Sequence, residues 1–228
     1  MAHKISFDRS ITPTPVSSGS DVTTTTLSVT GETAPTTVTA VNYTNFVVQV
    51  SSPGDTAGTQ AATCTDTQGS TYTLVKEVLF AGFALDVFSK LGAAVNVSTT
   101  VTVSHQPSKH RIIANNEWYN IGTFEKISSA LASTANAQVD VGEFKVGQKN
   151  WLVYAVLAIG GSSHGDSVTI PDDWNLMSDT GTNYGDGNDV RILVCYQIAK
   201  KRKKVDFKPL LSNPRVWGAT MFSYKEKL

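Results

Sequence analysis

The sequence is poor in charge and in long apolar runs, and each shortage excludes a class of protein. Charged residues make up only 17% of the chain, and 19 basic residues balance 19 acidic ones. A chain without net charge gives no global reason to expect a nucleic acid or an anionic membrane as its partner. The longest apolar stretch, residues 151–159, is far too short for a helix that crosses a bilayer.

Cysteine is also scarce, with Cys64 in a threonine-rich segment and Cys195 in an apolar one. A disulfide scaffold needs several paired cysteines, so two buried free thiols are the better interpretation. The first ten residues contain no apolar stretch of the kind found in secretory signals, so we expect no export. Without export, the sequons at Asn42 and Asn96 predict no glycosylation.

Threonine and serine take the place of charge, and they alternate with apolar residues. The segments "VTTTTLSVTG", "NFVVQV" and "VSTTVTVSH" have a period of two, which is typical of strands with one buried face. Turn-forming clusters such as "SSPGDTAGTQ" and "DTQGST" separate these segments. Short strands at this spacing, with no credible helix between them, predict an all-β protein of antiparallel sandwiches.

Two segments depart from this alternation. In residues 1–20, the "ISF" triplet precedes "TPTPVSSGS", whose prolines disfavour a long regular element, so we expect a short strand and an extended N-terminal arm. Residues 121–137 are rich in serine and alanine, and a turn or two of helix is arguable there. The surrounding strands favour a linker and a short strand instead.

Four segments recur in the same order in the two halves of the chain. The matched pairs are Phe46 with Trp151, Tyr72 with Trp174, Phe88 with Tyr196, and Trp118 with Phe222. The small differences in spacing fall in turns, where insertions are tolerated. The repeat predicts an internal duplication that gives two tandem antiparallel β-sandwich domains of jelly-roll or Ig-like type, residues 5–120 and 121–228. The repeated aromatic residues are expected in the cores.

The repeated motifs resemble a known family. Asp66 and Gly69 precede "STYTL", and the first half closes with "EWY" at residues 117–119. This pattern of strand and turn residues is similar to that of a tandem β-sandwich module of bacteriophage virion structural proteins, in which a second copy carries a tryptophan motif. Here "PDDWNLMSD" occupies that position, and "VWGATMFSY" closes the chain.

The resemblance implies a non-enzymatic structural protein in the virion, assembled in the host cytoplasm. Its implied role is capsid decoration or cement, or a component of a fibre or tail, with capsid or tail subunits as partners. We expect a homo-oligomer, no cofactor, no metal, no nucleic acid and no membrane contact. A glycan-binding adhesin or receptor-binding module on the particle surface is the alternative, since loops at one end of a sandwich can carry such contacts.

One charge run stands out, at Lys200, Lys201, Arg202, Lys203 and Lys204. Its position matches the uncharged turn "GAAVN" of the first half, so a solvated hairpin tip is one interpretation, and contact with an acidic neighbouring protein is the other. Two aromatic residues without a counterpart in the repeat, Trp217 and Tyr184, are the other candidate surface contacts.

The remaining polar groups give only weak candidates for chemistry. His105 and His110 lie close together, but a metal site needs a third ligand, so solvated turn histidines are the better interpretation. Asp186, Asn188 and Asp189 share a glycine-containing loop that suits a hairpin turn better than calcium. The letters of "GGSSHGDS" do not form the strained turn of a hydrolase nucleophile, so we expect no enzyme.

Overall fold

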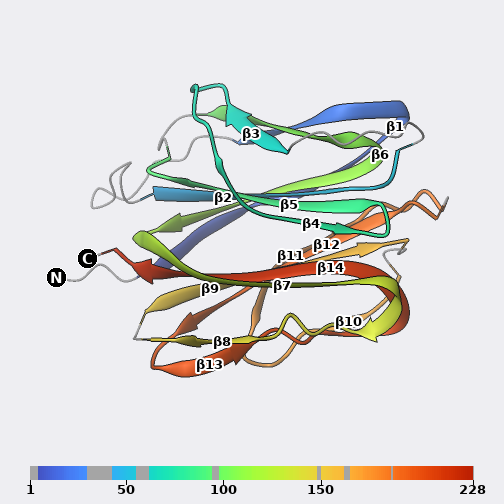
Figure 1. Cartoon of the computed structure of the whole chain (residues 1–228). Coiled ribbons are helices and arrows are strands. Elements are labelled where there is room, and N and C mark those ends of the chain that lie inside the picture. Colours follow the sequence, from blue (N-terminus) through green and yellow to red (C-terminus); the bar gives the residue numbers. More distant parts are fainter. Residues whose placement is uncertain are drawn as a thin grey trace.

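The computed structural model describes residues 5–29, 43–54, 62–93, 98–147, 150–161, 165–185 and 187–227. Every regular element in these ranges is a β-strand (Figure 1), which confirms the predicted all-β class. The described ranges contain no helix with the length and apolarity that crossing a membrane requires. His3, His164, Asp186 and the two sequon asparagines lie outside the described residues.

The first half of the chain forms one antiparallel sheet, here called the first sheet. Its spatial order is β1-β6-β2-β5-β4, and β3 also pairs with β6. Ala81 and Gly82 have positive φ angles of 48° and 86°, which suit the two-residue turn of the β4–β5 hairpin. The strands are β1 (Ser6–Val29), β2 (Tyr43–Ser51), β3 (Thr63–Asp66), β4 (Thr73–Phe80), β5 (Phe83–Leu91) and β6 (Thr99–Tyr119).

The second half forms a second sheet and a small outer ribbon. In the second sheet β14 lies between β7 and β9, followed by β12 and β11, and β10 pairs with the start of β14. Strands β8 and β13 pair only with each other and make the outer ribbon. The strands are β7 (Ile121–Gln138), β8 (Glu143–Val146), β9 (Trp151–Gly160), β10 (Val168–Thr169), β11 (Asn175–Gly181), β12 (Val190–Ala199), β13 (Lys203–Asp206) and β14 (Leu210–Glu226).

The two sheets have the same strand order. β1, β6, β2, β5 and β4 of the first sheet correspond to β7, β14, β9, β12 and β11 of the second. The chain passes from the first sheet to the second at Asn120, between β6 and β7, which is the position of the predicted domain boundary. The repeat is therefore visible as topology, while its origin by duplication stays a prediction.

The sheets pack face to face and share one central core (Figure 1). Five of its largest side chains are fully buried: Phe46 and Trp118 from the first sheet, and Leu152, Tyr154 and Phe222 from the second. Phe83 and Phe80 approach the second sheet so closely that a Cβ at Gly160 or Gly218 would lie 2.5 Å from a ring carbon. The division of the chain into two domains, residues 5–120 and 121–228, stays a prediction.

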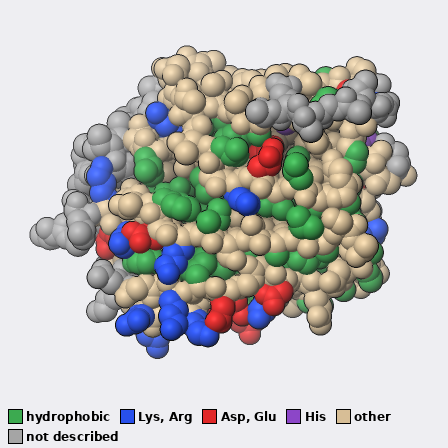
Figure 2. Space-filling view, in the orientation of Figure 1, with side chains coloured by type: hydrophobic (Ala, Val, Ile, Leu, Met, Phe, Trp, Pro, Cys, Tyr) green, Lys and Arg blue, Asp and Glu red, His purple; other side chains and the backbone are tan. Residues whose placement is uncertain are grey.

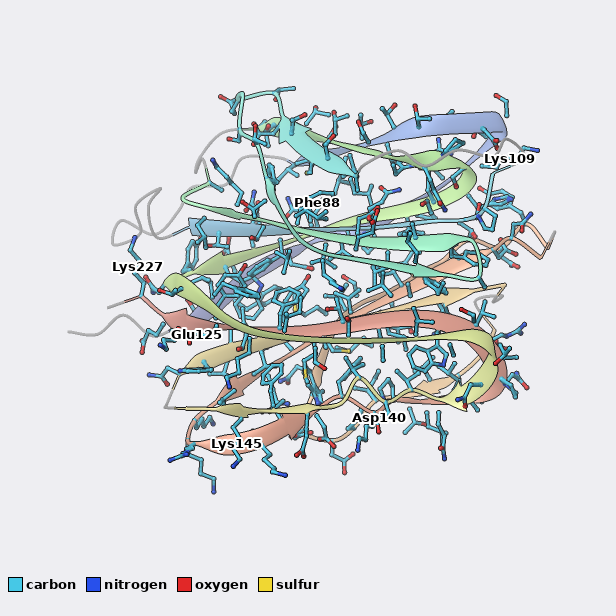
Figure 3. All side chains as sticks on the ribbon, in the orientation of Figure 1. Phe88, Lys109, Glu125, Asp140, Lys145 and Lys227 are labelled. Atoms are coloured by element: carbon cyan, nitrogen blue, oxygen red, sulfur yellow. The ribbon has the colours of Figure 1, made fainter. Side chains whose placement is uncertain are left out.

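Each sheet also buries its outer face, so the molecule is a stack of layers. In the first half, Val47 and Phe88 pack beneath Leu27, Tyr72 and Cys64, and Figure 3 shows Phe88 inside this half. In the second half, the apolar side chains of the outer ribbon cover the outer face of the second sheet, where Cys195 is buried. Both thiols are free, and they lie in opposite outer cores.

Strands β1 and β7, each at one edge of its sheet, are longer than the sequence predicts. β1 has 24 residues and pairs with β6 along its length, which corrects the expectation of a short strand followed by an extended arm. Pro13 and Pro15 fit because β1 is an edge strand and its pairing is irregular between Ile11 and Thr14. β7 has 18 residues where a linker and a short strand were expected.

The predicted residue pairing is wrong in two strands. Phe46 faces the central core, whereas Trp151 faces the outer core of the second half. Phe88 faces the outer core of the first half, whereas Tyr196 packs against the central core. Because side chains alternate between faces, a shift of one residue turns each of them to the other side of the sheet.

A shared β-bulge gives the correct alignment. The β4–β5 pairing shifts after Leu74, and the β11–β12 pairing shifts in the same way after Leu176. When the sheets are aligned on this bulge and the strand pairings are followed outward, Phe46 corresponds to Tyr154, and Trp118 to Tyr224. All of these corresponding side chains face the same side of their sheets.

Candidate functional site

The basic segment connects the second sheet to the outer ribbon. Lys200, Lys201 and Arg202 follow β12 and are exposed, and the next residues belong to β13, which pairs with β8 and not with β12. The segment is therefore a crossover between layers and not the expected hairpin tip. Figure 2 shows lysine and arginine side chains gathered at the lower end of the molecule, where Figure 1 places β8 and β13, and Figure 3 shows Lys145 pointing outward there.

The last two lysines of the segment have acidic neighbours. Lys203 Nζ lies 3.1 Å from Asp173, and Lys204 Nζ lies 2.5 Å from Glu143 on the neighbouring strand. The hydrogen bond from Lys204 lowers the pKa of Glu143 below its ordinary value. Among the described residues, Lys200, Lys201 and Arg202 have no ion pair. These three charges form the part of the segment that remains open to a partner.

The structure separates the two aromatic candidates. Tyr184 is 57% exposed, and its ring stacks on His110 at a centroid distance of 5.1 Å. Trp217 is only 4% exposed and belongs to the outer core of the second half. The expectation of a surface contact at Trp217 is therefore wrong, because its position in β14 faces the outer ribbon.

The loop of Asp189, expected to be a hairpin turn and not a calcium site, is held together by this carboxylate. Asp189 accepts hydrogen bonds from the backbone N–H groups of Tyr184 and Gly185, both at 2.9 Å, and from the hydroxyl of Thr182 at 2.8 Å. Burial alone would raise the pKa of Asp189, but these hydrogen bonds lower it. The carboxylate therefore acts as the internal acceptor of a turn, while Asn188 is exposed.

The two neighbouring histidines are buried residues of β6, which corrects the expectation of solvated turn histidines. His105 is hydrogen-bonded to Thr25 Oγ1 at 2.8 Å and to the Gln106 carbonyl at 2.7 Å. Burial lowers the pKa of His105, and His110 is 4% exposed. The described part of the chain contains no group of three or more histidine, cysteine or acidic side chains able to hold a metal ion.

A cleft of about 410 Å³ opens on one side of the central core, between the edges of the two sheets. Leu74 and Leu91 line it from the first sheet, and Phe124 and Tyr224 line it from the second. Leu74, Leu91 and Phe124 are 41%, 47% and 41% exposed. Ser89 lies at the inner wall, where it accepts a 3.1 Å hydrogen bond from the Tyr224 hydroxyl.

No pattern in the sequence indicated this cleft. Apart from Thr71, its residues come from four strands in both halves, so only the packing of β4 and β5 against β7 and β14 brings them together. Phe124 is the only aromatic residue in a segment otherwise rich in serine and alanine. That isolated ring was the one available signal, and its partners could not be identified without the fold.

A polar cluster is buried on the outer face of the first sheet. Gln49 and Asn115 are fully buried, and both atoms of each amide have no hydrogen-bond partner in the described structure. Asp86, paired across the strands with Gln49, has one unpaired carboxylate oxygen. Burial, followed by repulsion from Glu77, raises the pKa of Asp86 to about 7.

The second sheet is apolar at the corresponding positions. Leu157, Leu193 and Met221 occupy the places of Gln49, Asp86 and Asn115, and they pack in the outer core. The polar cluster is therefore a specific feature of the first half. It is destabilising as long as its buried polar atoms have no hydrogen-bond partner. Its amides and carboxyl can hydrogen-bond water molecules or a small polar ligand.

Comparison of the chain with protein-family models, with curated proteins and with solved structures gives no match.

Proposed function

We propose that the chain is a non-enzymatic structural protein of a bacteriophage virion, where it binds other coat or tail subunits. The proposed role is capsid decoration or cement, or a component of a fibre or tail, and the protein is present in several symmetric copies. The sequence motifs around Tyr72 and Trp118 support the family, and the exposed apolar side of the sandwich supports the binding role.

The observation that carries the proposal is the row of exposed apolar side chains along β4 and β7. Leu74 and Leu79 on β4, and Phe124, Ile127 and Leu131 on β7, are between 40% and 52% exposed. Hydrophobic side chains gathered on one face are characteristic of protein interaction sites. Figure 2 shows green side chains across the middle of this face.

The backbone of this side also suits an assembly role. In the described structure, β4 pairs only with β5, and β7 only with β14, so each strand has one free edge. A free edge can accept a strand from a neighbouring protein through main-chain hydrogen bonds. The charges of Lys200, Lys201 and Arg202 provide a second contact, with an acidic surface of a neighbouring subunit.

The test is to purify the particles and quantify their proteins by mass spectrometry. The proposal predicts that this chain co-purifies with the particles at a fixed ratio to the major coat or tail protein after a high-salt wash. Its absence from purified particles would overturn the proposal. In the alternative function as an adhesin, the protein binds a host-surface glycan, and a glycan array with the purified chain tests that binding directly.

A further inference from the structure

The two open sides of the central core carry corresponding residues. On one side Phe124 contacts Tyr224, with ring centroids 5.4 Å apart. On the other side Phe7, from β1, contacts Trp118 at 5.1 Å. Phe7 corresponds to Phe124 in the alignment based on the bulge, because each is paired across the strands with the corresponding residue, Trp118 or Tyr224.

The two sides differ in one interior position. On the Phe7 side, the ring of Tyr196 lies 5.0 Å from Trp118 and 5.9 Å from Phe7, so an aromatic side chain fills the space between them. The residue that corresponds to Tyr196 is Ser89, which has no ring. The cleft of about 410 Å³ lies next to Ser89. The second half therefore supplies a ring to the Phe7 side, whereas the first half supplies none to the Phe124 side.

We propose that this cleft binds an aromatic side chain of a neighbouring protein, which takes the place that Tyr196 occupies on the other side. This inference rests on the proposed function, because the occupant is a segment of another virion protein. The walls suit a ring: Phe124 and Tyr224 offer edge and face contacts, and Leu74 and Leu91 offer apolar surface. The cleft also falls in the volume range of ordinary ligand pockets.

Charge defines the occupant further. Lys90 lines the cleft, and the described structure gives it no ion pair. A carboxylate beside the incoming ring would complement this ammonium. The occupant is therefore an extended segment in which an aromatic residue neighbours an acidic one, lying along the free edge of β4.

The probe is the acetylated and amidated tripeptide Asp-Tyr-Asp, compared with Asp-Ala-Asp, added to the full chain in an NMR titration. The tyrosine peptide should shift the backbone signals of Leu74, Ser89, Leu91 and Phe124 saturably, and the alanine peptide should not. Equal shifts with both peptides, or shifts that map elsewhere, overturn the proposal.

Two variants test the geometry. Ser89→Tyr should supply the missing ring from within and weaken tyrosine-peptide binding by at least about tenfold, the order expected for losing aromatic contacts. The exposed Ser133→Tyr, at the other end of β7, should bind like the parent. Phe124→Ala keeps the test valid if Ser89→Tyr does not fold, since removing this wall should weaken binding similarly. A folded variant of either kind with parental affinity contradicts the proposal.

The same variants separate the cleft from the proposed function. If the purified chain binds the tyrosine peptide but is absent from purified particles, the cleft proposal stands and the virion role is rejected. Normal incorporation of folded Ser89→Tyr and Phe124→Ala chains retains the virion role and rejects the cleft as its docking site.

Discussion

The phenol of Tyr154 donates a hydrogen bond to the side chain of Asn116, across the interface between the two sheets. The corresponding residues, Phe46 and Phe222, make the reciprocal contact with ring centroids 5.7 Å apart. The halves thus meet through the same positions in both directions, as in the isologous interface of a symmetric dimer. This shared core implies that the two halves depend on each other for stability.

Phe46→Ala should therefore destabilise the whole chain and not only its own half. The Phe46 ring is fully buried and lies 5.0 Å from Tyr154 and 5.3 Å from Tyr224. Truncating a core aromatic residue lowers the free energy of unfolding by roughly 3–5 kcal/mol. Denaturation followed by tryptophan fluorescence and by circular dichroism should show one earlier transition with both probes. Two separate transitions, with the second half unaffected, would contradict the shared core.

Tyr154→Phe should have a smaller effect, because the ring remains and only the hydroxyl is lost. Loss of a buried hydrogen bond that leaves its partner under-satisfied lowers the free energy of unfolding by about 1–3 kcal/mol. Tyr184→Phe is the matched control, since Tyr184 is 57% exposed and should change stability by less than about 0.5 kcal/mol. Equal stability of the two variants in urea denaturation would show that the Tyr154–Asn116 bond contributes nothing.

Asp86 should make the protein less stable as the pH rises from about 4 to about 7. Burial raises the pKa of Asp86 from 3.8 to about 7, so over this range the folded chain keeps a proton that the unfolded chain releases. Ionisation therefore favours unfolding, by up to about 4 kcal/mol above pH 7, and the loss is absent below pH 4.

Asp86→Asn removes this titration. Its free energy of unfolding, relative to the parent, should increase between pH 4 and pH 7, as measured by urea denaturation at several pH values. Asp140→Asn, at an exposed carboxylate, should keep the parental profile. Parallel profiles for the parent and Asp86→Asn would refute the role of Asp86.

The basic segment should affect assembly without affecting folding. Lys200, Lys201 and Arg202 are exposed, so replacing all three with serine should leave the melting temperature within about a degree, because exposed charges contribute little to stability. If the segment docks on an acidic neighbour, incorporation into particles should fall, and parental incorporation should itself weaken with salt through screening over about 8 Å. Equal occupancy of parent and variant at low and high salt would exclude docking.

The sequence predicted those features that depend on local pattern. Alternation along residues 99–104 was enough to predict a strand, and the recurring aromatic residues indicated two halves that join near Asn120. The face of each strand was harder to predict. The alignment of Phe46 with Trp151 failed because both strands are buried on both faces, so their apolar runs carry no alternation that fixes the register.

Features that depend on distant residues were not predictable. Trp217 was expected at the surface because it has no counterpart in the repeat. It is buried because the outer ribbon, which comes from two separate segments, covers it. The segment between His105 and His110 contains a proline and was interpreted as a turn, yet it continues as part of β6. The cleft beside Ser89 exists only because the two sheets stack, and only comparison with Tyr196 shows what it lacks.

The most direct test of the account is a cryo-electron microscopy reconstruction of the particle that carries the protein. The account predicts density for two stacked six-stranded sheets in symmetric copies, with the β4–β7 side against a neighbouring subunit and a ring beside Ser89. A complete reconstruction in which every coat and tail position is filled by other folds would contradict it.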